Sequence, residues 1–528
     1  MQNVGSLAID PQEIQDPILT IQSPPQAEKE IVNKSLFYSL SLYLRMFFKL
    51  IGGIIMAKLL GPNLYGLRNA IDLVLTYESY SNLGTFAALN RQAPYYRGEN
   101  DTKTADLAIS SVFTANILLA TIVSVLLMLV SVYAWQVGWE TRYIDFFFFL
   151  GLIILTKKLS EFYTTKLKID KNFYVLSRME MIYGVATTLV AVPLVYFWGF
   201  RGLLLGLFLL DVICLGYILI EDWYIPSINF SFSLFWELVK IGFPIMILFS
   251  MLLLLGSADR TLILAMLSEE DLGYYGIATI ATSIIGTIPG AIHSVTIAPI
   301  MEKLGHTKDI HRIKNFLTEP TVLLAYIIPL LLAAIYFGIH LPIRYYLTEF
   351  EPSIEVVKIL IIGLFFEAVA TPSMSISLAL NKQVKLFFVV GPVVLLNVAL
   401  SYFLIRFGWD LDGVAAGTSL SYIVFFCVMT WYALKQFGGT TREYFSVLVS
   451  ILIPFLYALL LILALDNLFA SSIQGLWSDL LFTAIKGCLF VLLYGLIILR
   501  VRKQPAFVKL AGNLPLTHLI PNKLKIRF

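Results

Sequence analysis

Long apolar runs separated by short polar segments fill the chain between residues 35 and 499. A helix needs roughly 20 mostly apolar residues to cross about 30 Å of hydrocarbon. The pattern therefore predicts fourteen membrane-spanning helices. They cover residues 35–57, 69–90, 106–134, 144–163, 175–198, 202–220, 235–267, 272–299, 317–340, 355–380, 384–406, 412–434, 445–465 and 479–499.

Two of these spans are atypical. The span 144–163 is purely apolar only in its first half, before Lys157 and Lys158. The span 235–267 is long and carries Asp259 and Arg260 near its far end. Both are counted among the fourteen spans.

Composition supports lipid as the solvent. The chain is 58% hydrophobic and 14% charged, with a mean hydropathy of +0.80. Soluble proteins are roughly 45–50% apolar and 25% charged. We therefore expect an all-α integral membrane protein of about fourteen helices. The polar loops are too short for a globular catalytic or ATPase domain, and no phosphate-loop motif is present. We expect no cofactor, and the cysteines show no spacing typical of a metal site.

Lysine and arginine are distributed unevenly between the two sides. With the N-terminus in the cytoplasm, the cytoplasmic segments hold twenty-four of them and the opposite loops hold six, among them Arg68 and Arg142. The positive-inside rule then places both termini in the cytoplasm of a bacterial inner-membrane protein. The basic C-terminal tail, Arg500 to Arg527, is interpreted as an anchor for anionic membrane lipid, and no nucleic-acid partner is expected.

The two halves of the chain echo each other. Gly66 and Gly273 each follow a turn after the first and seventh spans, and the pattern Gly-x-x-x-Gly recurs at 202–206 and 413–417. Six spans per unit make these parallel repeats, with a site expected between two lobes. The predicted organisation is a disordered cytoplasmic tail (1–33), an N-lobe (34–220), a C-lobe (221–434), an appended helix pair (435–500) and a basic cytoplasmic tail (501–528).

Ionisable residues inside the first two spans indicate a hydrated cavity. Arg45 and Lys49 are four residues apart and share one helix face. An Arg or Lys at mid-bilayer costs about 2.5–3.5 kcal/mol, so this face must point into the protein. Asp72 lies on a polar face of the second span. These residues are predicted to bind an anionic substrate; the alternative is that Arg45 pairs with Asp72 and joins two helices.

The seventh span offers equivalent candidates in the second lobe. Lys240, Asp259 and Arg260 are also predicted substrate-binding residues. Lys240 has the alternative of extending its amine to the membrane surface. Asp259 and Arg260 have the alternative of forming an internal salt bridge.

Three further acids lie alone in apolar spans: Glu180, Asp211 and Glu367. A buried acid can bind a coupling proton or sodium ion. Each could equally be hydrogen-bonded to a neighbouring helix, and both interpretations stay open.

Several motifs resemble those of one transporter family. They are AKLLGPNLYGL at 57–67, KIGFPIMILFSMLLLLGSADRTLILAML at 240–267, LALNKQVKLFFVVGPVVLLNVALSYFLI at 378–405 and GVAAGTSLSY at 413–422. Together they resemble the Wzx-type oligosaccharide flippases of the multidrug/oligosaccharidyl-lipid/polysaccharide (MOP) exporter superfamily. The resemblance covers about residues 34–434.

The resemblance implies two six-helix lobes that rock around a central cavity. It also implies a substrate of sugars linked by diphosphate to a polyprenyl lipid, flipped from the cytoplasmic to the outer leaflet. A polysaccharide polymerase and a coupling ion, H⁺ or Na⁺, are candidate partners. The alternatives are a cation-coupled multidrug exporter, which would require acids in the cavity, a membrane polymerase or glycosyltransferase, and a structural scaffold.

Overall fold

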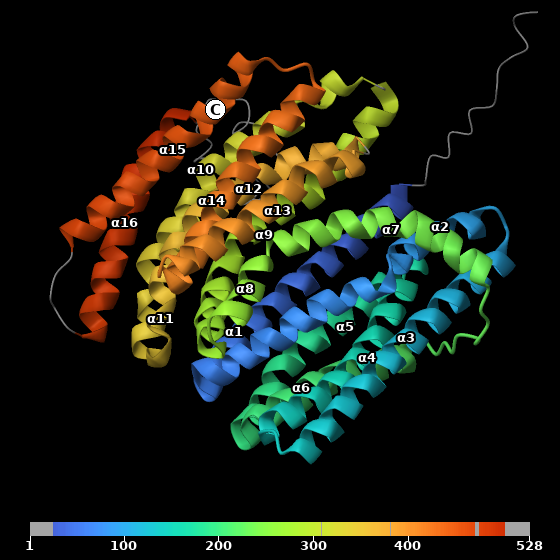
Figure 1. Cartoon of the computed structure of the whole chain (residues 1–528). Helices are drawn as coiled ribbons and strands as arrows, with labels where there is room; N and C mark the ends of the chain where they lie inside the picture. Colours follow the sequence, from blue (N-terminus) through green and yellow to red (C-terminus); the bar gives the residue numbers. More distant parts are fainter. Residues whose placement is uncertain (1–24, 308, 381, 470–474, 502–528) are drawn as a thin grey trace, which may run out of the picture.

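The computed structural model describes residues 25–307, 309–380, 382–469 and 475–501. Within these ranges the chain forms helices and no strand (Figure 1). The first half contains α1 (Pro25–Glu78), α2 (Thr85–Gly98), α3 (Thr102–Val137), α4 (Thr141–Ile169), α5 (Phe173–Ala186) and α6 (Val192–Glu221). The second half contains α7 (Phe232–Leu255), α8 (Ala258–Met266), α9 (Glu269–Thr307), α10 (Asn315–Gly338), α11 (His340–Tyr345), α12 (Ser353–Ala379), α13 (Gln383–Arg406), α14 (Asp410–Gln436), α15 (Thr441–Leu468) and α16 (Leu476–Val501).

The predicted all-α membrane architecture is confirmed. In the described ranges, ten stretches are long and apolar enough to cross a membrane. Two of them, Leu40–Asn82 and Phe173–Glu221, are interrupted by glycines with positive φ, so each contains two predicted spans. The predicted spans 144–163 and 355–380 are not among the ten, but they are continuous helices, α4 and α12.

Left-handed glycines reverse the chain at one end of the bundle. Gly61, Gly138, Gly199 and Gly408 have φ of 68°, 81°, 55° and 82°. Glycine adopts this conformation without the penalty that a Cβ brings. Because the helices alternate in direction, these four turns lie at the same end, here called the Gly61 end. The opposite end, where α4 turns into α5 at Asp170, is called the Asp170 end.

Several boundaries differ from those predicted. The predicted span 69–90 is broken at Leu83 and Gly84, which both have positive φ, and α2 begins after this break. The first helix begins at Pro25, inside the predicted tail, while residues 1–24 and 502–528 lie outside the described residues. The second span resumes at Pro62, so Arg68 belongs to a helix and was wrongly assigned to a loop. The span 235–267 is broken at Gly256–Ser257 into α7 and α8.

The helices form two bundles joined along α1 and α9. Helices α1 to α6 pack together as the first lobe, and α9 to α14 pack together as the second (Figure 1). Helix α7 packs against α2 and α3 of the first lobe and against α13 of the second, so it bridges them. Helices α15 and α16 pack on each other and on α10, outside the second bundle.

The repeated glycines lie where helices approach closely. A Cβ on Gly206 would lie 3.1 Å from Ala191 Cα, and one on Gly417 would lie 3.0 Å from Ser401 Cα. Both contacts join two consecutive helices of one lobe, as small residues do in membrane helix pairs. The two lobes therefore use the Gly-x-x-x-Gly pattern in the same way.

Candidate functional site

A cavity of about 250 Å³ lies between the two lobes and is called the central cavity. Three of its residues are cations and one is an acid, so the lining carries a formal excess of two positive charges. On α1 and α9 the lining residues recur three or four positions apart, so they lie on one face of each helix. The lining residues are Met46, Lys49, Leu50, Arg68, Asn69 and Asp72 of α1, Arg260 of α8, and Gly276, Thr279, Ile280 and Ser283 of α9.

Arg68 is the most buried cation of the central cavity. Its Nη2 lies 3.5 Å from Asp72 Oδ2, and its Nη1 donates to the Tyr65 hydroxyl at 3.2 Å. Its Nε is buried and has no hydrogen-bond partner. A buried N–H group without an acceptor is uncommon in proteins and indicates a place for a water or a ligand.

Lys49 and Arg260 complete the cationic lining. Neither forms an ion pair within the described part of the chain, although Asp72 is the strongest electrostatic neighbour of Lys49. The Arg260 Nη2 donates to the Gly256 carbonyl oxygen at 3.2 Å, and its buried Nε also has no partner. Two guanidinium groups on opposite lobes thus retain unused donors next to one cavity.

Arg45 does not line the central cavity. Its guanidinium forms an ion pair with Glu180 of α5 and lies 4.1 Å from the centroid of the Tyr183 ring. Arg45 therefore joins α1 to α5 inside the first lobe. The alternative, that Arg45 forms an ion pair with Asp72, is wrong. The ion-pair partner of Asp72 is Arg68.

The predicted ion-coupling acids occupy two different places. Glu180 and Asp211 both lie near Arg45, with Glu180 fully paired to it. Glu367 lies in α12 of the second lobe, and its carboxylate has no ion pair or side-chain hydrogen bond among the described residues. Glu367 is an electrostatic neighbour of Tyr422 of α14.

Lys240 and Asp259 also lie away from the central cavity. Asp259 is buried and accepts hydrogen bonds from the Tyr275 hydroxyl at 2.5 Å and from the Arg260 backbone N–H at 2.7 Å. Its carboxylate does not form an ion pair with the Arg260 guanidinium, so that predicted alternative is wrong. Lys240 is exposed on α7 and does not line the cavity.

The lobes are sealed together between the central cavity and the Gly61 end. A Cβ on Gly66 would lie 1.7 Å from the Glu269 carbonyl oxygen, so the backbones touch directly. The Asn69 amide donates to the Leu272 carbonyl oxygen at 3.2 Å. The Tyr143 hydroxyl donates to Glu269 at 2.9 Å, which ties α4 to α9. These contacts are called the rim seal.

One family model decides the family. The model described as "Polysaccharide biosynthesis protein" matches residues 55–349, which is more than half of the chain. The chain belongs to this polysaccharide biosynthesis protein family. The resemblance to polysaccharide transporters of the MOP superfamily is thereby confirmed. No curated protein sequence matches this family member.

Solved structures share the fold of this polysaccharide biosynthesis protein. "Lipid II flippase MurJ, inward closed conformation" has a TM-score of 0.59 at 14% identity, covering 89% of this chain and 100% of that one. An inward-facing multidrug resistance MATE family transporter of the MOP superfamily has a TM-score of 0.56 at 14% identity, with coverages of 76% and 94%. A MATE transporter in complex with MaD5 has a TM-score of 0.54 at 14% identity, with coverages of 78% and 96%. The chain therefore has the fold of these MOP-superfamily transporters, with helices long and apolar enough to cross a membrane several times.

Sequence reasoning named three residues that line the central cavity among its six predicted binding residues: Lys49, Asp72 and Arg260. It missed Arg68, although the spacing of Arg68 and Asp72, four apart on one helix, was a usable signal. It also missed the pairing of Arg45 with Glu180, for which a separation of 135 residues offers no local signal.

Proposed function

We propose that this protein flips a polyprenyl-diphosphate-linked oligosaccharide from the cytoplasmic to the outer leaflet during surface polysaccharide biosynthesis. The observation that supports this most is the central cavity, with its excess of two positive charges and two buried guanidinium N–H groups that lack acceptors. A diphosphate carries about two negative charges and many acceptor oxygens. Charge-assisted hydrogen bonds from Arg and Lys would replace the water that the headgroup loses.

The size of the central cavity limits what it holds in this conformation. A volume of about 250 Å³ lies below the range of roughly 300–1,000 Å³ that is typical of small-molecule sites. It accommodates a diphosphate, while an attached oligosaccharide requires the lobes to separate. Asn69, Thr279 and Ser283 place hydrogen-bonding groups beside the cations, where the first sugar would lie.

The rim seal gives the proposal a direction. With both termini in the cytoplasm, as the positive-inside rule predicts, the Gly61 end faces outward, and the rim seal closes the central cavity on that side. Substrate then enters from the Asp170 end and leaves after the rim seal has opened. An impermeant thiol reagent tests the orientation in a variant without Cys214, Cys427 and Cys488. A cysteine at Arg406 should label in intact cells, whereas one at Lys168 should label only after lysis.

Of the three predicted coupling acids, we favour Glu367 as the ion-binding group. Glu180 is neutralised by Arg45, and Asp211 has the cations Lys157 and Arg45 as electrostatic neighbours. Glu367 has no cation among its electrostatic neighbours in the described part of the chain. An unpaired carboxyl in an apolar span is costly when charged, so it gains most from taking up a proton or sodium ion.

The charge of the central cavity argues against the alternative of a multidrug exporter, because an excess of positive charge would repel cationic drugs. A membrane enzyme using metal chemistry would require clustered acids or histidines, and no group of three such residues occurs within the described ranges. A surface polysaccharide polymerase remains a proposed downstream partner.

Binding to the purified protein tests the proposal directly. Full-length protein in lipid nanodiscs should bind a short polyprenyl diphosphate, and the variant Arg260→Gln should bind it on the order of tenfold more weakly. The matched control Lys168→Gln removes an exposed cation outside the cavity and should bind normally. Equal binding by Arg260→Gln and the control would overturn the diphosphate assignment.

A further inference from the structure

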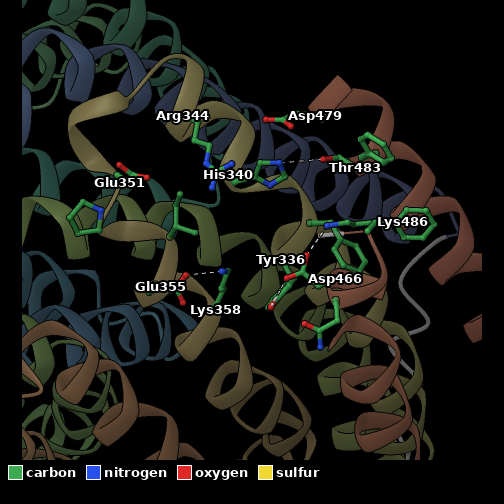
Figure 2. Close-up of a pocket in the computed structure, with 16 residues that line it drawn as sticks. Tyr336, His340, Arg344, Glu351, Glu355, Lys358, Asp466, Asp479, Thr483 and Lys486 are labelled. Atoms are coloured by element: carbon green, nitrogen blue, oxygen red, sulfur yellow. Dashed lines mark hydrogen bonds and ion pairs between the residues drawn. The ribbon is translucent and has the colours of Figure 1, made fainter. Parts of the chain in front are cut away.

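A second cavity, of about 610 Å³, lies between the second lobe and the helix pair α15–α16. Figure 2 shows its side chains converging from α10, α11 and α12 on one side and from α15 and α16 on the other. The residues Tyr336, Asp466 and Asp479 come from the ends of their helices nearest to the Gly61 end. This cavity, called the lateral cavity, is therefore at one membrane surface.

Some charges in the lateral cavity are already compensated. Lys486 Nζ lies 2.7 Å from Asp466 Oδ1, and Lys358 Nζ lies 2.7 Å from Glu355 Oε1 (Figure 2). The Tyr336 hydroxyl also donates to Asp466, at 3.3 Å. These side chains line the cavity, and because their charges are already paired they contribute little to binding a charged ligand.

Three charged groups remain available. Arg344 and Glu351 are exposed, line the cavity and form no ion pair among the residues that the structure describes. Asp479 accepts one hydrogen bond, from the Tyr345 hydroxyl at 2.8 Å, and forms no ion pair in those residues. The lateral cavity thus offers one free cation and two acids, which suits a ligand that carries charges of both signs.

An apolar cleft of about 310 Å³ adjoins the lateral cavity and shares Tyr336, Glu355 and Lys358 with it. The cleft is lined by α10, α12 and α15. On each helix its apolar residues lie further from the Gly61 end than the polar residues of the lateral cavity do. Leu332 precedes Tyr336 by one turn on α10, Ile359 and Ile362 follow Glu355 on α12, and Leu459 and Leu463 precede Asp466 on α15. The polar cavity therefore lies at the surface and the cleft lies beneath it, within the apolar part of the helices.

We propose that these two adjoining spaces hold one zwitterionic aminophospholipid of the phosphatidylethanolamine class. Arg344 binds the phosphate with its planar guanidinium. Glu351 and Asp479 accept hydrogen bonds from the ammonium, which has three donors. One acyl chain fills the cleft along Leu332, Ile362 and Leu459. The bound lipid bridges the second lobe and the helix pair.

Charge complementarity favours this occupant over others. Including the compensated pairs, the lateral cavity has three permanent cations and four acids, a formal charge of minus one. An anionic phospholipid or a diphosphate headgroup would meet repulsion there. A choline headgroup would match in charge, but its quaternary nitrogen has no N–H to donate to Glu351 or Asp479.

Lipid retention by the full-length protein tests this inference. The purified protein is exchanged into nanodiscs containing equal parts of phosphatidylethanolamine, phosphatidylcholine and phosphatidylglycerol, and the lipids that remain bound after delipidation are counted by native mass spectrometry. We expect phosphatidylethanolamine to be retained preferentially. The double variant Arg344→Gln/Glu351→Gln should retain it about tenfold more weakly. Both residues are exposed, so folding should be unaffected.

Two further variants separate headgroup, chain and general effects. Leu459→Trp should fill the cleft and lower retention while leaving the headgroup residues in place. Arg406→Gln removes a cation at the same end of the molecule but outside both spaces, and should retain lipid as the parent does. Unchanged retention in the double variant, or a preference for phosphatidylglycerol, would overturn the proposal. Polyprenyl diphosphate competing equally with phosphatidylethanolamine would do so too, by making the lateral cavity a substrate site.

Discussion

The central and lateral cavities both contain basic and acidic side chains but differ in how their charges are balanced. The central cavity has three cations and one acid, and only Arg68 has a carboxylate partner there. The lateral cavity pairs Lys358 and Lys486 with acids of its own walls. Because transferring a charge out of water is costly, an unbalanced cavity gains most from a ligand of opposite charge. The comparison suggests that charge balance, more than residue type, decides what each cavity binds.

Removing charge from the central cavity should reduce export far more than removing charge from the lateral cavity. This loss of export is the largest expected effect. The double variant Lys49→Gln/Arg260→Gln leaves the central cavity with no excess charge, since Arg68 is balanced by Asp72. Polysaccharide export should fall on the order of a hundredfold or more, because two charge-assisted interactions are lost. Surface glycan and cytoplasmic lipid-linked intermediate are measured in a deletion strain carrying the variant.

The matched change in the lateral cavity is Arg344→Gln, which should leave export within about twofold of the parent. Protein abundance in the membrane, measured by immunoblotting, separates lost function from lost protein. Comparable losses of export from both variants would remove the distinction between the cavities.

Glu367 gives a second test of the comparison. Its carboxylate has no counterion among the described residues, and it lines neither cavity. Glu367→Gln removes the ionisable group while keeping its shape, and we expect gradient-driven flipping in proteoliposomes to drop on the order of tenfold. Binding of polyprenyl diphosphate should be unchanged, because the central cavity is intact. Glu180→Gln serves as a contrasting variant: it strips Arg45 of its partner and should lower thermal stability. A Glu367→Gln protein that still responds fully to both proton and sodium gradients would exclude this residue as the coupling site.

Weakening the rim seal should open the central cavity and leave the lateral cavity unchanged. Gly66→Ala places a methyl group where the Glu269 carbonyl oxygen already lies, so the lobes must separate there. We expect this conformation to be destabilised by about 1–3 kcal/mol. Accessibility of a cysteine at Thr279 to a thiol reagent should rise. The control Gly286→Ala, which lies on α9 together with Thr279 and has open space around its Cβ position, should change nothing. Unaltered accessibility in Gly66→Ala would show that the seal is not a gate.

The smallest effect is expected at a cluster whose charges are already paired. At the Asp170 end, Asp170 accepts hydrogen bonds from Lys166 at 2.6 Å and from Arg97 at 2.7 Å. Partial burial alone would raise the pKa of Asp170, but these two cations outweigh it and hold the pKa below its ordinary value. The stabilisation is therefore present above the unfolded pKa and is lost as the pH falls through the lowered one.

Asp170→Asn should cost about 0–1 kcal/mol at neutral pH, because the pairs are partly exposed. The difference in thermal stability between the variant and the parent should shrink toward acidic pH. Export should be unaffected. A difference that grows as the pH falls would contradict the sign of the pKa shift.

The helices and their order follow from the apolar pattern, because lipid forces every buried backbone group into a helix. The break at Gly256–Ser257 was harder to predict. The residues between Leu255 and Leu262 read GSADRT, and such a short polar stretch fits a continuous helix with one charged face as well as a broken helix. Arg68 was misplaced for a related reason: it follows Gly61-Pro62 and Gly66, residues typical of a loop, and the cavity that it lines also involves α9 from the other lobe.

The sequence by itself determined an all-helical membrane protein, its family, and the presence of cations inside its spans. These follow from composition, periodicity and short motifs, which are local along the chain. Only the tertiary structure decided which charges are free. Arg45 and Lys49 share a helix face, yet Glu180 neutralises one and the central cavity exposes the other. Whether a charge in the membrane supports the fold or binds a ligand depends on its partner, and that partner is on another helix, far away in sequence.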